Sequence, residues 1–428
     1  MGNLSKYEST MYNISEIYIN FSDGTYLTIP SERIVSMDIN KDFDNHIMPL
    51  INLRATVEIT TFNKIMENKS SVKFNISLGS FNVNIESDEY KSGDYDTIPH
   101  NLTSVLSGDF VIFSNETSVN ISTNLMEKTY ATDNGESIQE GPEKFSSDLD
   151  IYLYKANSLM IDKQFNSLVF SESTLSDVIL YMAKHVGINN LLMSPLDNIS
   201  TYHDIITPAN SFKNIIYGLQ DIYGLYNTGV VLFYDYNRTY LLSKDHKITA
   251  IEKNELKYVN ITIYEKGELK SSYEGSYITD NEYYINCIIE PSTSDNTQLI
   301  KEKFGDTVYS ISSYNNEHET YNSSINGYDW VSPVVLDNKV GNTYIMNSYI
   351  YDVEESLNTM TISFPTANIN YLTPNKVYNI KCEISNSVAS EKYSGIYRLS
   401  SVEVIFKKEG SRTFRGITTC SLKKYNRG

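Results

Sequence analysis

Two pairs of closely spaced carboxylates are the first candidates for chemistry in this chain of 428 residues. Asp94 and Asp96 flank a tyrosine, and Asp148 and Asp150 flank a leucine. Paired carboxylates can serve as the acid and the base or nucleophile of a glycoside hydrolase. Such pairs also arise without function in an acidic chain, and this chain carries 53 acidic against 35 basic residues. We therefore expect acidic loop residues here, and a cell-wall hydrolase ranks lowest among the functions considered.

Recognisable patterns of nucleophiles and metal ligands are missing from the sequence. It contains no Walker A loop, no Gly-x-Ser-x-Gly elbow and no His-Glu-x-x-His motif. The three cysteines, Cys287, Cys382 and Cys420, form no Cys-x-x-Cys pair, so the spacing favours neither a disulfide framework nor a zinc site and indicates folding in a reducing cytoplasm. No ligand spacing connects the histidines, which are His46, His100, His185, His203, His246 and His318.

One acidic stretch imitates a calcium-binding loop. Asp38, Asn40 and Asp42 match the first three ligand positions of an EF-hand, but Phe43 stands where glycine is required and Pro49 where the bidentate glutamate belongs. We interpret this stretch as the end of a strand and a solvated loop. The sequence as a whole predicts no catalytic, cofactor-binding or metal-binding residues, and no cofactor.

The charge of the chain limits its partners. A net charge of -18 repels nucleic-acid phosphates and anionic membranes, which argues against a dedicated DNA-binding protein. Against this background the C-terminal region carries a basic set that either docks an acidic partner or forms the solvated face of a strand. Its members are Arg412, Arg415, Lys423, Lys424 and Arg427.

The stretch 165–242 organises the chain, because it holds the only convincing helices and separates two long β-type blocks. Ser173 or Thr174 can cap the first helix, and Gly187 ends it. His185 lies near the end of this helix, where capping or the helix dipole explains it better than catalysis. The predicted core face comprises Leu175, Val178, Ile179, Met182, Ala183 and Val186.

A second amphipathic helix follows Pro208. Ser211 can cap it, and Gly224 ends it. Strands at 230–233 and 239–242 then form a hairpin, so the whole stretch is predicted to be a small α/β module. The core face of the second helix is predicted to comprise Phe212, Ile215, Ile216, Leu219 and Ile222.

The first β block opens with a hairpin around the Asp-Gly turn at 22–25. Apolar and polar residues alternate along 51–59 and 72–78, which is typical of strands with one buried face. A short helix is expected at 62–67, and long loops are expected at 87–97 and 131–148.

The second β block continues the same alternation and has no visible sequence repeat with the first. With 12% aromatic residues, including 35 tyrosines, both blocks favour antiparallel sheets or barrels. The polar stretch 298–327 is predicted to be an excursion from this block. Strands are expected at 259–263, 285–289, 360–364, 377–382, 393–404 and 418–422, with a turn at 407–410.

The N-terminus lacks a basic flank followed by an apolar segment, and no apolar run approaches the roughly 20 residues of a membrane span. We expect a soluble chain that is neither exported through a signal peptide nor anchored in a membrane.

Several stretches resemble baseplate hub proteins of contractile-tailed bacteriophages. The run from Ile29 to Asp44, continuing through 48–51 into a strand, resembles the opening of these proteins. The segments 175–179, 192–198 and 223–226 before the hairpin 230–242 are similar to their central domain, and 393–399 resembles the late strand of their second barrel. The resemblance covers most of the chain in order and rests on apolar and turn patterns.

The resemblance implies a structural virion protein without enzyme activity. It would form a homotrimeric hub in the tail baseplate, assembled in the host cytoplasm, that joins the sixfold tail tube to the threefold tail spike and forms part of the DNA channel. The implied partners are the tail tube protein and the tail spike or cell-puncturing protein, with tape-measure and baseplate wedge proteins as further ones. DNA would pass through transiently and without specificity.

The resulting prediction is a mainly β protein with a smaller α/β part, in which two tube-like antiparallel β-barrels flank or surround the central module. The predicted domains are an N-terminal barrel at 1–149, the α/β domain at 150–246 and a C-terminal barrel at 247–428 with the excursion at 298–327. The alternative is a β-rich receptor- or carbohydrate-binding tail protein whose tyrosines stack on sugars. Against it, most tyrosines fall inside predicted strands.

Overall fold

The computed structural model describes the greater part of the two β blocks and nearly all of the central module. It describes residues 8–44, 49–85, 87–93, 95–97, 101–113, 146–235, 238–244, 256–265, 274–288, 358–365, 367–384 and 387–424. It also describes short strand segments at 130–131, 137–138, 292–295, 312–313, 324–325, 328–329 and 335–336, and the single residues Tyr344 and Ser348. The predicted excursion at 298–327 lies almost entirely outside the described residues.

The first β block contributes eight strands to the main sheet and contains one longer helix, with the alternating burial that the sequence pattern predicts. Along β5, for example, Ile51, Leu53, Ala55 and Val57 are buried, whereas the residues between them are more exposed. Helix α1 (Ile59–Glu67) confirms the short helix expected at 62–67. The strands are β1 (Glu8–Ile14), β2 (Ile17–Asn20), β3 (Tyr26–Ile29), β4 (Ile34–Asp42), β5 (Leu50–Glu58), β6 (Lys73–Asn84), β7 (Thr103–Ile112) and β10 (Ser146–Lys155).

The second block supplies the remaining strands of the same sheet. Most neighbours are antiparallel, but β16 pairs in parallel with both β18 and β25. The strands are β16 (Tyr258–Tyr264), β17 (Gly275–Thr279), β18 (Glu282–Ile288), β19 (Ser292–Asp295), β24 (Asn358–Phe364), β25 (Val377–Glu383), β26 (Gly395–Lys408) and β27 (Thr413–Lys424), with helix α7 (Ser387–Tyr393) before β26.

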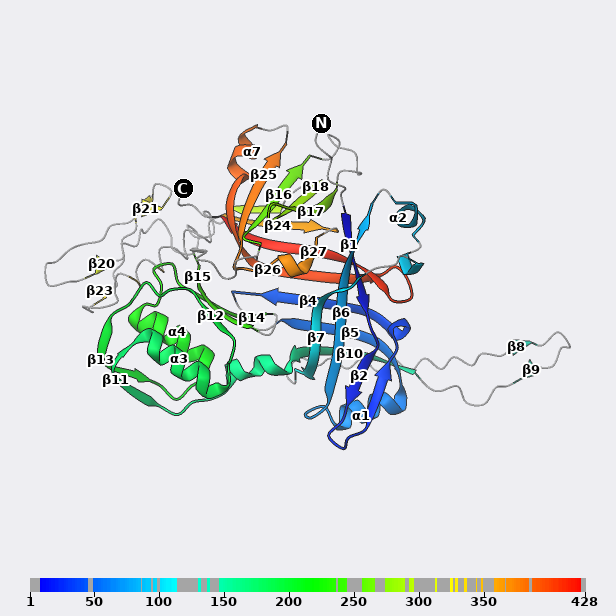
Figure 1. The fold of residues 1–428 in the computed structure, drawn as a ribbon, viewed down its shortest axis with the longest axis horizontal. Helices are drawn as coiled ribbons and strands as arrows, with labels where there is room; N and C mark the ends of the chain where they lie inside the picture. The colour runs from blue at the N-terminus through cyan, green and yellow to red at the C-terminus, as the bar shows by residue number, and fades with distance from the viewer. Residues whose placement is uncertain are drawn as a thin grey trace.

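All of these strands belong to one sheet that closes into two rings (Figure 1). Hydrogen-bonded neighbours form the first ring in the order β1-β6-β7-β10-β5-β4-β26-β27 and back to β1. The second ring runs β1-β17-β18-β16-β25-β26-β27 and back to β1. The prediction of a mainly β fold with two barrels and a smaller α/β part is confirmed. The prediction that both barrels are antiparallel is wrong for the second ring, because β16 pairs in parallel with β18 and β25.

The two rings share the long hairpin β26–β27. The first residues of β26 pair with β25, at Gly395 to Tyr397, and its later residues pair with β4, at Ser401 to Phe406. A register shift between Leu399 and Ser401 marks the point where the strand changes partners. Such a bulge bends a strand and increases its twist, which allows one strand to serve two barrels.

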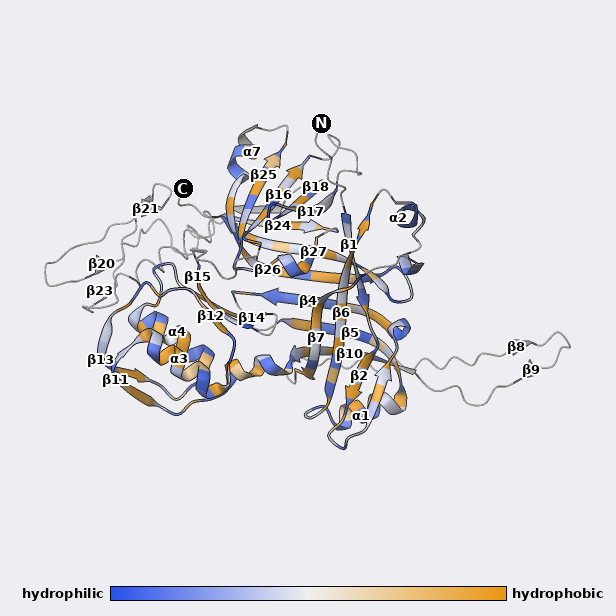
Figure 2. Cartoon of the chain, viewed as in Figure 1, coloured by the Kyte–Doolittle hydropathy of each residue, from blue (hydrophilic) through white to orange (hydrophobic). Residues whose placement is uncertain are grey.

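One hydrophobic cluster fills both rings. It includes residues from β4, β5 and β6 as well as from β16, β24 and β27. Figure 2 shows hydrophobic and hydrophilic residues alternating along these strands. Because apolar side chains from both rings belong to this one cluster, the two rings have a continuous core.

The central module contains two helices packed on each other and on short strands. Helix α3 (Leu175–Val186) starts with a reciprocal capping box between Thr174 and Asp177 and ends at Gly187, whose φ of 87° suits glycine. Its six predicted core residues are all buried. The strands here are β11 (Leu168–Thr174), β12 (Leu191–Met193), β13 (Thr201–Thr207), β14 (Val230–Asp235) and β15 (Arg238–Ser243), and the connection from β10 is the 3-10 helix η3 (Ala156–Asp162).

Helix α4 (Phe212–Tyr223) is capped by Ser211, as predicted, but its core face differs at one position. Ile222, predicted to be buried, is 51% exposed. Gln220 is buried instead, because its side chain bonds the turn that follows the helix. Its Oε1 accepts from the backbone N–H groups of Leu225 and Tyr226, each at 3.0 Å, and its Nε2 donates to the Tyr226 carbonyl at 3.0 Å.

The hairpin β14–β15 joins the module to the first ring. Val231, Phe233, Tyr240 and Leu242 belong to the barrel cluster, whereas Leu232 and others on the opposite face belong to the module cluster. Phe233 stacks on Tyr240 with ring centroids 4.5 Å apart. With one face in each core, the hairpin fixes the module to the barrel.

A buried ion pair supports the same junction. Lys41 of β4 donates from Nζ to both carboxylate oxygens of Asp235 at 2.9 Å, and both side chains are nearly inaccessible. Lys155, at the end of β10, is also buried nearby. Burial lowers the pKa of Lys155, and the neighbouring Lys41 charge lowers it further, while Asp235 opposes both effects.

Two local predictions are wrong. The stretch 87–97, expected to be a loop, contains the short helix α2 (Asp88–Ser92), capped by Ser87, and a 3-10 turn at 95–97. The turn expected at 407–410 starts later, because Lys407 and Lys408 still pair with Arg415 and Phe414 across the hairpin. The loop expected at 131–148 lies mostly outside the described residues, and β10 already begins at Ser146.

The domain limits 1–149, 150–246 and 247–428 stay a prediction. Closure of the first ring involves β26 and β27, which come from the end of the chain. Within the part of the chain that the structure describes, none of the helices combines the length and apolar character needed to cross a membrane.

Candidate functional site

Of the first acidic pair, the structure describes Asp96, and its role is structural. The Asp96 carboxylate accepts hydrogen bonds from the backbone N–H of Ser411 at 2.7 Å and from Thr413 Oγ1 at 2.8 Å. Burial alone would raise the pKa of Asp96, but these bonds from the β26–β27 turn together outweigh it and lower the pKa. Gly410 is required there, since a Cβ would lie 2.6 Å from the carboxylate oxygens. Asp94 lies outside the described residues.

The second acidic pair lies on strand β10 and not in a loop as expected. Asp148 and Asp150 point away from the barrel core, because the intervening Leu149 is buried. Asp150 pairs with Arg54 of β5, with Arg54 Nε 3.2 Å from Asp150 Oδ2. The aspartates therefore belong to the outer face of the first ring.

That outer face brings together polar residues from four neighbouring strands, β26, β4, β5 and β10. Asp38 of β4 lies opposite Asn52 of β5, and Asn40 of β4 lies opposite Glu403 of β26. These residues alternate with buried apolar ones along each strand. We call the set Asp38, Asn40, Asn52, Arg54, Asp148, Asp150 and Glu403 the polar sheet face.

The polar sheet face is rich in hydrogen-bond acceptors that lack donors. Asp38 Oδ1, Asn52 Oδ1 and Asp150 Oδ1 are buried from solvent and have no hydrogen-bond partner among the described residues. Burial raises the pKa of Asp38, and the nearby carboxylates of Glu403 and Asp150 raise it further, against the effect of Arg54. The face is therefore electronegative and presents carboxylates with a single adjacent guanidinium.

The predicted calcium-like residues Asp38, Asn40 and Asp42 lie along β4. Among the residues that the structure describes, no group of three or more His, Cys, Asp or Glu side chains is arranged to hold a metal ion. His185 lies at the end of α3 against aromatic rings, with its ring centroid 5.6 Å from Phe165. His203 is exposed and contacts Glu172. The other four histidines lie outside the described residues.

The C-terminal basic set does not form one free patch. Arg415 donates to the Tyr95 hydroxyl at 2.9 Å and pairs with Glu409, and Arg412 is 4.0 Å from Glu32. Lys424 donates to the Lys392 carbonyl. Arg427 lies outside the described residues. These contacts tie the hairpin β26–β27 to the rest of the chain.

The most strongly buried charge was not predicted from the sequence. Arg398 of β26 is 0% exposed and donates from Nη1 to Asp44 Oδ1 at 2.9 Å. Lys423 of β27 donates to Asp44 Oδ2 at 2.6 Å, and the Ser400 hydroxyl donates to the same oxygen. Burial alone would raise the pKa of Asp44, but Arg398 and Lys423 outweigh it and hold the pKa well below its ordinary value. An arginine inside an alternating apolar strand is the sequence pattern that could have indicated this site.

The Asp44 carboxylate also influences a tyrosine of the module. Burial, with the Asp44 charge as a second cause, raises the pKa of Tyr217 on α4 to about 12. The cluster of Asp44, Arg398, Ser400 and Lys423 thus lies where the shared hairpin, the end of β4 and the module meet.

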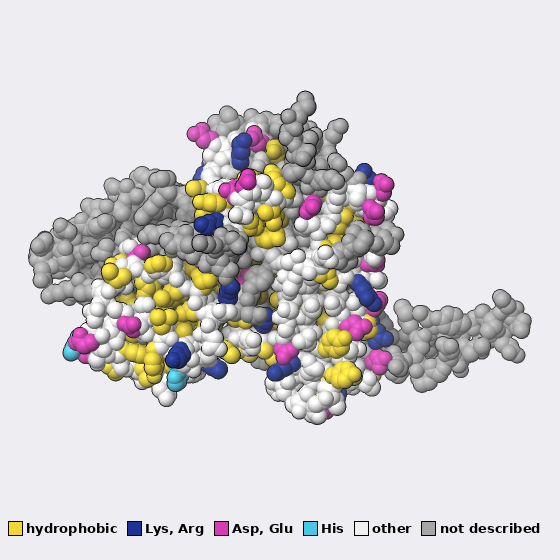
Figure 3. All heavy atoms as spheres, viewed as in Figure 1, with side chains coloured by type: hydrophobic (Ala, Val, Ile, Leu, Met, Phe, Trp, Pro, Cys, Tyr) yellow, Lys and Arg dark blue, Asp and Glu magenta, His cyan; other side chains and the backbone are white. Residues whose placement is uncertain are grey.

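The module also carries exposed apolar side chains. Figure 3 shows hydrophobic groups gathered over the module. Leu180 and Tyr181 of α3 and Ile222 of α4 are each about half exposed, and Val169 lies opposite Ile206 on the β11–β13 pair, both more than half exposed. Exposed apolar patches mark contact surfaces in many proteins.

The whole-chain fold is shared with phage-type tail proteins. The tail protein from Neisseria meningitidis MC58 matches with a TM-score of 0.53 at 10% sequence identity, over 97% of this chain and 97% of that chain. The prophage MuSo2 43 kDa tail protein from Shewanella oneidensis matches with a TM-score of 0.50 at 8% identity, over 96% and 97% of the two chains. At such identities the likeness defines a class of fold.

Sequence comparison identifies the family. The model of the family "Bacteriophage PBS1 gene 109 protein" matches residues 4–425, so the chain belongs to this family. No curated protein sequence matches the chain. The resemblance to a bacteriophage family is confirmed by this match, and the fold is that of the two tail proteins. The role of a baseplate hub stays a prediction.

Proposed function

We propose that the protein is a structural component of a phage tail, and specifically a homotrimeric baseplate hub that joins the sixfold tail tube to the threefold tail spike. The observation that carries this proposal is the pair of closed rings held together by the shared hairpin β26–β27. Three chains in a closed cyclic array would present six barrels to the tube and keep threefold symmetry towards the spike.

The polar sheet face is the surface that we assign to the DNA channel. A channel wall has to let the phosphate backbone slide without holding it, and carboxylates repel phosphates. Asp38, Asp150 and Glu403 supply such charges, and the apolar core of the barrel lies behind them. A reconstruction of the trimer that places this face on the outer circumference would contradict the assignment.

The proposed partners follow from this position. They are the tail tube protein above, the tail spike or cell-puncturing protein below, and tape-measure and baseplate wedge proteins as additional contacts. DNA passes transiently and without specificity. The protein works without a cofactor and without catalysis, is assembled in the host cytoplasm and resides in the virion.

The oligomeric state tests the proposal. Light scattering of the purified protein, alone and mixed with its tube and spike proteins, should reveal a species of about three times the 48.8 kDa chain. The reason is that a trimer of two-barrel chains matches a sixfold neighbour on one side and a threefold neighbour on the other. A chain that remains monomeric at high concentration with both partners present would exclude the hub.

A receptor- or carbohydrate-binding tail protein is the alternative. Among the described residues, the most exposed tyrosines do not converge on one surface loop: Tyr18 and Tyr26 lie on the β2–β3 hairpin, Tyr181 on α3 and Tyr258 on β16. This distribution favours the structural role. A glycan-array screen of the purified chain would decide between the two.

A further inference from the structure

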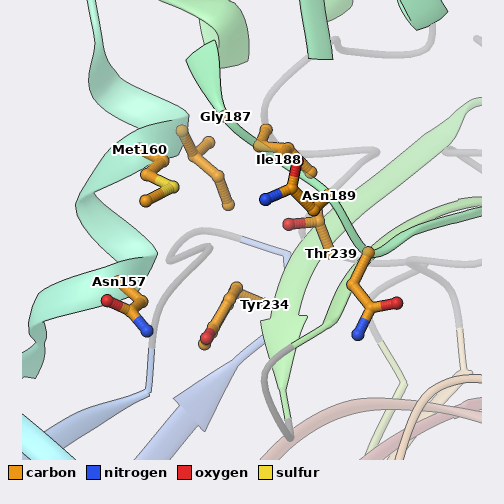
Figure 4. A pocket seen from close by; sticks show the side chains of 9 residues that line it. Asn157, Met160, Gly187, Ile188, Asn189, Tyr234 and Thr239 are labelled. Carbon is orange, nitrogen blue, oxygen red and sulfur yellow. The ribbon is translucent and has the colours of Figure 1, made fainter. Parts of the chain in front are cut away.

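A small pocket lies at the junction of η3, the α3–β12 connection and the hairpin β14–β15 (Figure 4). Its volume is about 340 Å³. Figure 4 shows Asn157 and Met160 on one side, Ile188 and Asn189 above, and Tyr234 below the open space. The pocket is at the lower end of the size range of ligand sites in proteins.

The lining of this pocket mixes polar with apolar side chains, the latter from Met160, Ile161 and Ile188, and it carries no charged side chain. It contains the carboxamides of Asn157, Asn189 and Asn190 and the hydroxyl groups of Tyr234 and Thr239, and no Asp, Glu, Lys, Arg or His. Burial and the neighbouring Asp235 raise the pKa of Tyr234 to about 12, so its phenol stays neutral. A carboxamide has both donors and an acceptor, as a peptide group does. The pocket therefore suits an uncharged group that has both a hydrogen-bond donor and a hydrogen-bond acceptor.

In the described part of the chain, a strand edge without a neighbouring strand starts at the pocket. Asn190 lines the pocket, and β12 begins at the next residue. Asn190 accepts from Thr239 N at 2.8 Å, and Ser194 N donates to the Leu241 carbonyl at 3.0 Å, so these residues direct their main-chain groups towards β15. By alternation, the main-chain groups of Leu191 and Met193 point the other way.

In the described part of the chain, β15 is the one strand next to β12. The three residues of β12 are half-buried. A parallel or antiparallel segment could therefore add to this edge, in the way that extended peptides join sheets in many complexes.

We propose that an extended segment of another polypeptide adds to the edge of β12 at Leu191 and Met193 and places an uncharged polar group in the pocket between Asn157, Asn189 and Tyr234. The open edge favours a polypeptide over a sugar, because only a polypeptide can continue a main-chain hydrogen-bond ladder. The proposal does not depend on the trimeric hub, since all of its residues come from one chain.

The probe is a random-peptide display library selected on the full-length protein, followed by titration of the best synthetic peptide. Two variants test the two halves of the site. Asn157→Asp places a negative charge in the pocket at an exposed position. Leu191→Pro removes an N–H that points away from β15 and leaves the β12–β15 bonds in place. The control Asn214→Asp makes the same chemical change on the exposed start of α4.

We expect selected peptides without a charge at the anchoring position, with affinity at least tenfold lower for Asn157→Asp and for Leu191→Pro and unchanged for Asn214→Asp. Melting temperatures verify that each variant is folded. If Leu191→Pro does not fold, the affinity measured for Asn157→Asp decides by itself. Failure to select any peptide, or equal affinity for wild type and Asn157→Asp, overturns the proposal. So does binding of N-acetylglucosamine at this pocket without any peptide binding.

Discussion

Arg398 is completely buried, so its positive charge must be matched inside the protein. The Asp44 carboxylate supplies the matching oxygens, and Lys423 and the Ser400 hydroxyl donate to the same carboxylate. The charged residues that matter to this fold are therefore not the acidic pairs that the sequence makes conspicuous. Asp44, Arg398 and Lys423 come from distant positions, and their proximity depends on a strand order that spacing along the chain does not contain.

Replacement of Asp44 by asparagine should be strongly destabilising. The change keeps the shape of the side chain but leaves the guanidinium of Arg398 buried without a counter-charge, at a cost of about 3 to 5 kcal/mol in the free energy of unfolding. Denaturant titration at pH 7 measures this loss. The matched control is Glu32→Gln, which removes an exposed partner 4.0 Å from Arg412 and should change the free energy of unfolding by less than about 0.5 kcal/mol.

The pH dependence follows from the lowered pKa of Asp44. A carboxyl with a depressed pKa in the folded state contributes stability that is fully present above its unfolded pKa of about 3.9 and is lost as the pH falls towards the folded value. The difference between wild type and Asp44→Asn should thus be constant from pH 7 to about pH 5 and shrink below pH 4. A difference that stays constant down to pH 3 would show that the carboxylate charge is not the cause.

Among the elements, the helices of the module were predictable because their determinants are local. The cap at Thr174, the stop at Gly187 and the apolar spacing between them lie within one short stretch, and all of them are confirmed. The prediction that Ile222 is buried was wrong, because Gln220 takes the buried position at that end of α4. The Gln220 side chain accepts hydrogen bonds from the turn that follows the helix. The alternation of apolar and polar residues along the strands was equally predictable from the sequence. Which strands pair with each other was not.

A carboxylate on the buried face of α3 should prevent folding. Val178 is 0% exposed in the module core, so Val178→Asp would bury an unpaired charge at a cost of several kcal/mol and yield insoluble protein. Leu180→Asp is the matched control, because Leu180 is 51% exposed on the same helix and should tolerate the change. The soluble fraction and the melting curve after expression compare the two. Equal behaviour of both variants would mean that the buried face is assigned incorrectly.

On the scale of the whole molecule, the ends of the chain meet. The Tyr12 hydroxyl of β1 donates to the Ala367 carbonyl at 3.0 Å, across 355 positions of sequence, and β1 pairs with β27. The sequence predicts two β blocks on either side of an α/β module. It does not predict that strands from the end of the chain help to close the ring formed by the first block. Pairing over such separations leaves no periodic trace in the sequence, since a strand alternates in the same way whichever neighbour it has.

The shared hairpin makes both rings depend on the last strands of the chain. Removal of residues 395–428 deletes β26 and β27, which opens the first ring between β4 and β1 and the second between β25 and β1. It also exposes the edges of β4 and β25 and takes Arg398 and Lys423 away from Asp44. The truncated chain ending at Ser394 should therefore lose cooperative unfolding altogether and aggregate, and not merely lose the second barrel.

Limited proteolysis and thermal unfolding measure this outcome. The control ends at Lys424, the last residue of β27, and should melt as the full-length chain does, because both rings remain closed. If the two β blocks were independent barrels in chain order, the fragment 1–394 would still contain a protease-resistant piece covering the first block. A resistant, cooperatively melting N-terminal fragment would therefore contradict the shared-ring architecture, whereas complete digestion with the Lys424 control intact would support it.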